Sequence, residues 1–497
     1  MAEASAVERA LRAELGELRA QLAERDRTIV VLSEENAALR AQLGVVLERV
    51  AELERRVGQS PRNSDQPPSS EGYGKPPPRS RRQRGQRGQR GPGGQPGHEG
   101  TTLCQIADPD RVVCHAPRRC GCGRSLRRAP VTSVEVRQVF DLPEIRLDVT
   151  EHRIEHRACR CGRVTMAELP AGVNAPTQYG PSVRAVATYL LAGQHLPLGR
   201  TAQLLAEVLA APVGEGSLAA WYTQAAAGLA GFEAAVRDQL AAADVLGADE
   251  TGLRVDGRLH WLHTARTDEL TLLTVSERRG VAGMREAGVL PALRPGAVLV
   301  HDGWAPYREF DVTHALCGAH LLRELAAAAD VGGQADWATA MDRLLCEIND
   351  TVRAGREIGA RRLQPTLFTT YERRYQEIVD AGWAANPDHR PGQRGKRKRP
   401  KHVNLLDRLD AHRNEVLRFT GDFRVPFTNN GSERDIRPAK IRVKVAGGLR
   451  TINGAKAFAR LRSYLSTAAK QGRSPFQVLR DLHNGNPWIP VTRLETC

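Results

Sequence analysis

Three short acidic motifs have the residue types that metal-dependent chemistry requires. They lie at residues 248–251 (ADET), 300–303 (VHDG) and 429–434 (NNGSER). Hard cations such as magnesium take oxygen ligands, and a pair of them can clamp the attacking and leaving oxygens of a phosphodiester. The chain also carries a formal net charge of +15, which favours a polyanionic partner. Together these features suggest metal-dependent chemistry on a nucleic acid.

The composition places these motifs in a multidomain protein. At 497 residues the chain is too long for one ordinary core. The first residues contain no apolar run behind a basic start, and the apolar stretch at 185–199 is too short to cross a bilayer, so we expect neither a secretory signal nor contact with a membrane. Nine unevenly spaced cysteines do not resemble the disulfide framework of a secreted protein. We therefore expect a cytoplasmic protein.

Residues 8–57 repeat apolar side chains with heptad spacing. The a positions are Glu8, Leu15, Leu22, Ile29, Asn36, Leu43, Val50 and Val57, and the d positions are Leu11, Leu18, Arg25, Leu32, Leu39, Val46 and Leu53. Sustained a/d spacing indicates a coiled coil, and a single asparagine at an a position fits a parallel dimer. We predict that residues 1–58 form a coiled coil that makes the protein a homodimer or a higher oligomer. The alternative is one long helix packed on its own protein.

Residues 59–100 are rich in Pro, Gly, Ser, Gln and Arg and cannot bury a core. Residues 72–98 contain no acidic residue but seven cations, which are Lys75, Arg79, Arg81, Arg82, Arg84, Arg87 and Arg90. We interpret the segment as a disordered basic linker that tracks DNA phosphates through side chains such as Arg82 and Arg84. The alternative is a linker that only aids solubility.

Six of the nine cysteines fall between residues 104 and 161. Four of them form two C-x-C pairs, and the glycine after each pair would free backbone amides to face thiolate sulfur. The pairs are Cys120 with Cys122 and Cys159 with Cys161. The stretch 131–155 between them alternates apolar residues like the strands of a β-hairpin. We predict a zinc-ribbon-like module at residues 101–170, in which the four thiolates close a tetrahedral zinc site.

One residue separates the two cysteines of each C-x-C pair, whereas two residues separate them in the usual C-x2-C of such modules. The two thiolates of a pair would therefore bind the metal from closer positions along the chain. Nearby side chains that could replace a thiolate are Cys114, His115, His152 and His156. The alternative is that the cysteines are buried or redox-inert thiols that hold no metal.

The block at residues 171–243 is rich in Ala and Leu and is expected to be helical. Segments 198–210 and 217–227, joined by a turn at 211–216, resemble a helix-turn-helix, with Ser217 as a suitable N-cap. Helix pairs of this type read DNA in some proteins and only pack in many others. Because the second helix has few cations, packing is at least as consistent with the sequence as DNA binding.

From residue 244 onward the pattern changes to short strands and helices. We expect strands at 245–248, 259–265, 270–275, 297–300 and 314–317, and helices at 276–287 and 320–329. Three antiparallel strands followed by helix–strand units make a mixed α/β sheet. Residues 330–425 look helical and charged and interrupt this domain. We assign residues 244–475 to the sheet domain and residues 476–497 to a C-terminal tail.

The positions of the carboxylates decide which of them could share a site. Alternation along a strand places Asp249 and Glu250 on opposite faces, so only one of them should reach a given site. Asp302 follows a second strand, at the edge where α/β sheets usually bind ligands. Glu433 opens a helical stretch rich in Arg and Lys. Each carboxylate alone is typical of a solvated surface acid, but their shared position at the element edges of one domain favours a common site.

Seven stretches of the chain resemble a known family. They are 94–98 (GQPGH), 179–181 (YGP), 196–200 (LPLGR), 248–251 (ADET), 301–304 (HDGW), 317–321 (CGAHL) and 429–438 (NNGSERDIRP). With the order of coiled coil, Cys-rich module and helical block, they are similar to the transposases of the insertion sequence 66 family, which are DDE enzymes with an RNase H-like core. The resemblance covers nearly the whole chain, and the last stretch, with residues 447–472, is the most specific.

The resemblance implies that Asp249, Asp302 and Glu433 are the catalytic triad and bind magnesium or manganese. It also implies that the block at 330–425 is the insertion typical of this group. The cations expected to contact DNA are Arg434, Arg437, Lys440, Arg442, Lys444, Lys396, Arg397 and Lys398. The C-x-C pairs depart from the C-x2-C of the family's zinc module, which leaves the identity of the zinc ligands open.

Residues 317–320 form a C-x2-H pair. By itself the pair is best explained by a buried Cys317 at a strand end and a His320 that caps the following helix. Similar pairs in other DDE transposases suggest instead a structural motif near the active site. Two ligands are too few for a complete zinc site.

We predict a transposase that cleaves the ends of its element and joins the freed 3′-hydroxyl to target DNA in a metal-dependent reaction. Its partners would be inverted-repeat ends, target DNA and accessory transposition proteins. One alternative is a non-enzymatic DNA-binding regulator, which the motif at 429–434 argues against because a regulator needs no third carboxylate there. Another is an RNase H-like nuclease that cuts DNA but does not join strands.

Overall fold

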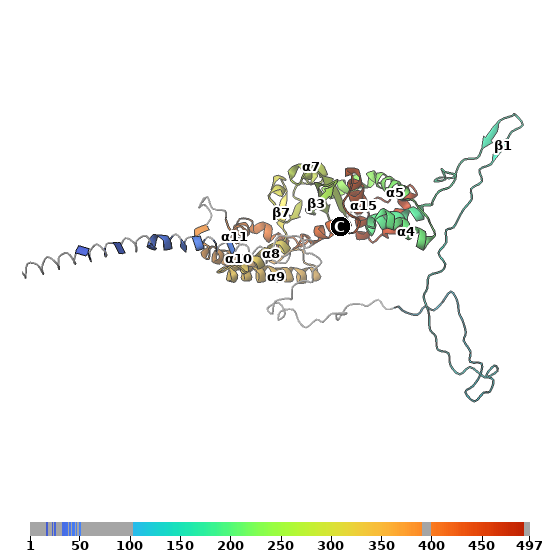
Figure 1. Cartoon of the computed structure of the whole chain (residues 1–497), viewed down its shortest axis with the longest axis horizontal. Coiled ribbons are helices and arrows are strands. Elements are labelled where there is room, and N and C mark those ends of the chain that lie inside the picture. The colour runs from blue at the N-terminus through green and yellow to red at the C-terminus, as the bar shows by residue number, and fades with distance from the viewer. Residues whose placement is uncertain are drawn as a thin grey trace, which may run out of the picture. The chain divides into compact units, whose positions relative to one another are not determined.

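The computed structural model describes residues 103–389 and 399–491, together with scattered residues between 16 and 50 (Figure 1). The chain divides into two compact units. Residues 234–440 make up most of the first, which we call the sheet unit. The second, which we call the helical unit, combines residues Tyr73–Glu233 with residues Ile441–Glu495. It therefore takes in residues 441–475, which the sequence analysis assigned to the sheet domain.

The sheet unit is built on five strands. They are β3 (Val245–Val255), β4 (Arg258–Arg266), β5 (Thr271–Ser276), β6 (Val298–His301) and β7 (Thr313–Leu316). Their order in the sheet is β5-β4-β3-β6-β7. The first three are antiparallel neighbours, whereas β3 with β6 and β6 with β7 are parallel. The predicted mixed α/β sheet is confirmed.

Strand β3 is much longer than predicted. The hydrophobic pattern ends at Ala248, but β3 pairs with β4 as far as Val255, and Asp249 lies opposite Thr264. A full ladder of backbone hydrogen bonds carries the strand through polar residues that an apolar pattern alone would exclude. The prediction that the first acidic motif follows a strand is therefore wrong, because Asp249 lies inside one. The strand ends at a two-residue turn, with left-handed φ values of 49° at Asp256 and 72° at Gly257.

Helices surround this sheet and fill the predicted insertion. They are α7 (Val281–Ala287), α8 (Gly318–Ala329), α9 (Ala335–Glu357), α10 (Pro365–Ala384), α11 (Lys401–Ala411), α12 (Arg413–Val416), α13 (Arg418–Gly421) and α14 (Asn430–Ala446). The insertion shares its core with the sheet: Met341 on α9 and Tyr375 on α10 belong to the same buried cluster as Val300 and Leu316. The insertion is helical, as predicted, and its core is continuous with β6 and β7. Its basic loop with Lys396, Arg397 and Lys398 lies outside the described residues.

The helical unit confirms the two predicted helices. Its elements include α3 (Pro181–Thr188), α4 (Leu198–Leu209), α5 (Glu215–Ala227), α15 (Ile452–Lys470) and α16 (Pro475–His483), and α6 (Ala230–Ala241) starts in it. Leu205 of α4 packs with Leu218 and Trp221 of α5 in one buried cluster. Ser217 is not the N-cap of α5, since the helix begins earlier and Gly214 takes that position. DNA binding by this pair stays a prediction.

The C-terminal residues differ from the predicted tail. Helix α16 packs on α3 and α15 and buries Val478, Leu479 and Leu482. Ser474 caps it, because its hydroxyl accepts a hydrogen bond from the Gln477 amide. This segment is therefore a folded part of the helical unit.

The Cys-rich segment contains much less sheet than predicted. Its strands are β1 (His156–Ala158) and β2 (Val164–Met166), which form a short antiparallel pair. The stretch 131–155 is not a hairpin: no strand is assigned to these residues, all of which are described, and Val131 and Val139 are 80% and 91% exposed. Alternation alone does not make a strand, because a strand also needs a hydrogen-bonded partner and a surface on which to bury one face.

The predicted coiled coil falls largely outside the described residues. The scattered residues that are described between 16 and 50 are helical, and the heptad positions among them, such as Leu22, Leu32 and Leu39, are exposed. Self-association through this helix stays a prediction. The basic linker with Arg82 and Arg84 also lies outside the described residues. In the part of the chain that the structure describes, no helix is long and apolar enough to cross a membrane.

Candidate active site

Asp249 lies on the face of β3 that meets the start of α14. A Cβ atom placed on Gly247 would lie 2.8 Å from both Asn429 Oδ1 and Ser432 Oγ, so only glycine allows this close approach. Residues two apart on a strand share a face. Asp249 therefore points to the side of the sheet where the third motif begins.

Asn429 joins three parts of this site. Its side-chain amide donates to the Ala248 carbonyl oxygen at 2.7 Å, and its Oδ1 accepts from the Ser432 hydroxyl at 2.6 Å. Its backbone N–H donates to Cys317 Sγ at 3.0 Å. Asn429, Ser432 and Cys317 are all buried. One side chain thus fixes the start of α14 against β3 and against the junction of β7 with α8.

A buried ion pair holds the next turn of α14. The Thr271 hydroxyl donates to Asp435 Oδ2 at 3.0 Å, and Arg266 Nε lies 3.5 Å from the same oxygen. The Arg266 guanidinium lies so close to Gly431 that a Cβ there would be 2.5 Å from Nη1. These contacts orient the helix that carries Glu433.

Replacing Asp435 with alanine should therefore disturb both stability and the position of Glu433. Loss of one partner of a buried pair leaves the other charge uncompensated, and we expect the free energy of unfolding to fall by about 3 kcal/mol. Asp268 is a matched control, because it also pairs with Arg266, at 3.0 Å, but is 99% exposed. Its replacement with alanine should cost less than about 1 kcal/mol. Urea unfolding of the two variants measures the difference, and equal losses would contradict this role for Asp435.

Asp302 follows the end of β6, as predicted, and its loop is tightly fixed. Its Oδ1 accepts from the Trp304 N–H at 2.9 Å, and His301 Nδ1 accepts from the Gly303 N–H at 3.0 Å. Gly303 has a φ of 91°, which favours glycine. Burial lowers the pKa of His301 to about 3, with the charges of His314 and Arg308 adding to the effect. His301 is therefore neutral and acts as a hydrogen-bond acceptor for the turn.

The carboxylates of the three motifs influence one another electrostatically. Burial raises the pKa of Asp249 well above its usual range, and the charges of Glu250, Asp302 and Glu433 raise it further. Like charges that cannot move apart disfavour ionisation, and a bound cation would reverse this effect. Asp302 and Glu433, which come from distant parts of the chain, thus lie near enough to Asp249 for their charges to affect its ionisation.

Glu433 is held by side chains from α8. Its Oε1 accepts from Arg323 Nη2 at 3.0 Å and lies 3.7 Å from His320 Nε2. Burial lowers the pKa of His320, and the neighbouring Arg323 charge lowers it too. The expectation that His320 caps the helix is wrong, because Cys317 occupies the N-cap position. The C-x2-H pair is a structural motif beside Glu433.

Glu250 belongs to the opposite face of β3. Its carboxylate accepts from the Tyr307 hydroxyl at 2.6 Å and from Arg279 Nη2 at 3.0 Å, and its side chain is only 2% exposed. Burial raises its pKa, while the Tyr307 hydrogen bond opposes that shift. Sequence reasoning identified neither Tyr307 nor Arg279, because no local pattern links them to Glu250.

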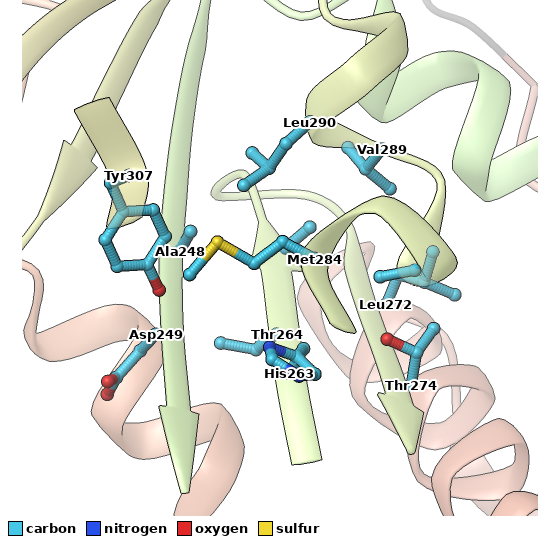
Figure 2. A pocket seen from close by; sticks show the side chains of 12 residues that line it. Ala248, Asp249, His263, Thr264, Leu272, Thr274, Met284, Val289, Leu290 and Tyr307 are labelled. Atoms are coloured by element: carbon cyan, nitrogen blue, oxygen red, sulfur yellow. The ribbon is translucent and has the colours of Figure 1, made fainter. Parts of the chain in front are cut away.

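A small cavity beside β3 is lined by Ala248, Met284, Tyr307 and neighbouring side chains (Figure 2). Figure 2 shows Met284 and Tyr307 reaching toward Ala248 on β3. The space available to water is about 20 Å³, which is room for roughly one molecule. It is too small for a nucleotide.

The predicted DNA-binding cations on α14 differ in their surroundings. Arg434, Arg437 and Lys444 are exposed, and Lys440 is partly buried. Arg442 lies over the Phe458 ring at 5.6 Å and donates to the Gly447 carbonyl oxygen at 3.3 Å. Burial lowers its pKa. Arg442 thus packs within the helical unit.

The two cysteine pairs form nearly identical turns. In each, the N–H of the first cysteine donates to the carbonyl oxygen of the arginine four residues later at 2.8 Å, and the glycine N–H donates back to the cysteine carbonyl oxygen. Gly123 and Gly162 have φ values of 92° and 88°. Hydrogen bonds from the Cys122 and Cys161 backbone lower the pKa of Cys120 and Cys159, respectively. All four cysteines of these turns are exposed.

The predicted metal ligands do not surround a common point in this structure. Among the residues that the structure describes, no group of three or more His, Cys, Asp or Glu side chains is arranged to hold a metal ion. The four cysteines remain as two separate turns, and Glu433 is paired with Arg323. The ligand assignments stay predictions.

Comparison with known families identifies most of the chain. Residues 176–457 match the transposase IS66 family, and residues 117–162 match the zinc-finger binding domain of transposase IS66. Residues 1–103 match a family of unknown function (DUF6444). A comparison with curated proteins found no match. The first match covers more than half of the chain and contains all three acidic motifs. The chain therefore belongs to the IS66 family of transposases.

Proposed function

We propose that this transposase cleaves the ends of its element and joins the freed 3′-hydroxyl to target DNA, using Asp249, Asp302 and Glu433. The observation that carries the proposal is the hydrogen bond by which Asn429 holds the start of α14 on Ala248 of β3, next to Asp249. The charges of Asp302 and Glu433 also raise the pKa of Asp249. The three carboxylates come from β3, the loop after β6 and helix α14. Three antiparallel strands continued by two parallel ones also support an RNase H-like core.

Magnesium or manganese fits this set of side chains. All the donors are carboxylate oxygens, which hard cations prefer, and their repulsion would be relieved by positive charge. Asp249, Asp302 and Glu433 would hold the ions. When bound, they would activate a water or a 3′-hydroxyl and stabilise charge on the phosphate.

The chain's own residues would position the DNA. Arg434 and Arg437 are exposed on the helix that carries Glu433, where they can neutralise phosphates on both sides of the scissile bond. Arg323 and His320 hold Glu433 against α8. Phosphoryl transfer depends mainly on positioning and charge neutralisation, so no protein nucleophile is needed.

The cysteine turns fit a structural zinc ion. Four thiols on two matched turns are the donors that zinc prefers, and each turn has a glycine where the backbone needs left-handed φ. Cys120, Cys122, Cys159 and Cys161 would hold the ion, and the module would contribute to DNA binding. The coiled coil would join two copies of the chain, and accessory proteins would complete the assembly.

A strand-transfer assay tests the proposed reaction. The DNA that flanks the gene would be supplied as pre-cleaved ends with a free 3′-hydroxyl, together with a target plasmid and magnesium. We expect joined products, because the same carboxylates would serve both steps. Cleavage of uncut ends without joining would favour a nuclease, and binding without either reaction would favour a regulator.

A further inference from the structure

An arginine of the helical insertion reaches the loop that carries Asp302. Arg408 lies on α11, which packs directly on α8. A Cβ atom placed on Gly303, the residue after Asp302, would lie 3.7 Å from Arg408 Cδ and 3.8 Å from its Nη1. The Arg408 guanidinium is therefore within van der Waals reach of this loop.

The same arginine also contacts the helix that supports Glu433. Arg408 Nη2 donates to Glu324 Oε2 on α8. Glu324 lies one turn after His320, on the same face of the helix, and His320 Nε2 is 3.7 Å from Glu433 Oε1. Burial lowers the pKa of His320, and the charges of Asp302 and Arg408 are among those that also act on it. Arg408 thus lies between the Asp302 loop and the helix face that holds Glu433.

These contacts leave part of the guanidinium available to a ligand. The hydrogen bond to Glu324 uses Nη2, and among the residues that the structure describes Arg408 Nε has no hydrogen-bond partner. The Arg408 side chain is 24% exposed, so solvent still reaches it. A guanidinium has five N–H donors in a planar fork, a geometry that matches the oxygens of a phosphate. Glu324 therefore fixes the direction of the group without using all of its donors.

We propose that Arg408 donates a hydrogen bond through Nη1 to a non-bridging oxygen of the scissile phosphate. This inference rests on the proposed function, because it assigns a further substrate contact to the same site. In phosphoryl transfer the non-bridging oxygens carry negative charge in the transition state, and donors that are fixed before the reaction stabilise it. The insertion would thereby contribute a catalytic residue of its own to the carboxylate site.

Variants that break the same ion pair from either side test this role. Arg408→Met should slow magnesium-dependent cleavage of uncut ends about 100- to 1,000-fold, the loss that follows removal of one transition-state donor. Glu324→Gln keeps the arginine and should slow cleavage by less than about tenfold, because a partly exposed ion pair contributes little by itself. Equal losses in the two variants would overturn the proposal, since each removes the same contact between α11 and α8.

A double variant separates the catalytic role from folding. In Arg408→Met/Glu324→Gln neither charge lacks its partner, so the urea midpoint should return toward that of the wild type. Cleavage should nevertheless stay as slow as in Arg408→Met, and its recovery together with stability would overturn the proposal. Arg374→Met is the matched control, because Arg374 on α10 pairs with Glu347 on α9 at 2.7 Å within the insertion. This control should cleave DNA like the wild type.

Binding without a metal separates this inference from the proposed reaction. The affinity of the intact protein for uncut ends is measured in EDTA, with either the natural phosphodiester or an uncharged methylphosphonate at the scissile position. The nearby carboxylates act on both substrates in every variant, so the informative quantity is the difference between proteins. Relative to Arg408→Met, the wild type should favour the charged phosphate about tenfold, as expected for one hydrogen bond to a charged group. The same preference in both proteins would refute the contact even if cleavage occurs, whereas the expected coupling would support it even if cleavage fails.

Discussion

Replacing Asp302 with asparagine should abolish strand cleavage and leave DNA binding intact. Asparagine keeps the shape of the side chain and can still accept from the Trp304 N–H, so the loop should survive. It removes one of the charges that would hold the divalent ions, and several kcal/mol of transition-state stabilisation would be lost with it. We expect cleavage to fall by roughly a thousandfold or more. Gel assays of cleavage and of binding to the same labelled DNA measure both properties.

Asp256→Asn is the matched control for this variant. Asp256 is exposed in the β3–β4 turn at a φ of 49°, a conformation that asparagine readily adopts. The Asp256→Asn variant should cleave DNA like the wild type. Magnesium should also raise the unfolding temperature of the wild type, because a cation relieves the repulsion around Asp249, and it should do so less in Asp302→Asn. Retained cleavage in Asp302→Asn would rule out its catalytic assignment.

The second large effect concerns zinc. The intact protein, purified under reducing conditions, should contain one zinc ion per chain, and Cys120→Ser should lose it. In the segment from residue 103 to 170 most apolar side chains are exposed, so a metal ion would have to supply much of its stability. Metal analysis and limited proteolysis measure the two consequences. A chelator should make the wild-type segment as sensitive to protease as the variant.

Other cysteines of the chain provide the controls for the zinc prediction. Cys346 is exposed on α9 in the sheet unit, and Cys346→Ser should keep the full zinc content. Cys114→Ser distinguishes the ligand sets, because it should lose zinc only if Cys114 replaces a thiolate of the C-x-C pairs. A wild-type protein without bound zinc would contradict the prediction outright.

Local patterns were enough to locate most elements of the sheet unit. The strands near residues 259–265, 270–275, 297–300 and 314–317 and the helical insertion at 330–425 all appear close to where they were predicted. Alternation also predicted that Asp249 and Glu250 lie on opposite faces of their strand, while the choice of Asp249 came from the family resemblance. These predictions were correct because side-chain periodicity and turn residues determine conformation over a few neighbouring positions.

The same patterns failed where a segment depends on a distant partner. Residues 131–155 alternate like a strand, yet among the described residues no neighbouring strand forms a backbone ladder with them, and most of their apolar side chains are exposed. Conversely, residues 249–255 begin with polar side chains and still form seven of the eleven residues of β3, because β4 supplies the backbone partners. Strand formation at both places is decided by pairing, which lies outside any local window.

The amino-acid sequence alone was sufficient to point to three carboxylates, two cysteine pairs and the resemblance to a transposase family. Only the tertiary structure brought Glu433 to Asp249, through Asn429, Gly247 and the buried pair of Arg266 with Asp435. It alone revealed that Arg408 of the insertion lies beside the loop that carries Asp302. The physical reason is that residue type and spacing encode chemistry and local conformation, whereas a site built from separate strands, loops and helices depends on contacts that form only when the chain packs.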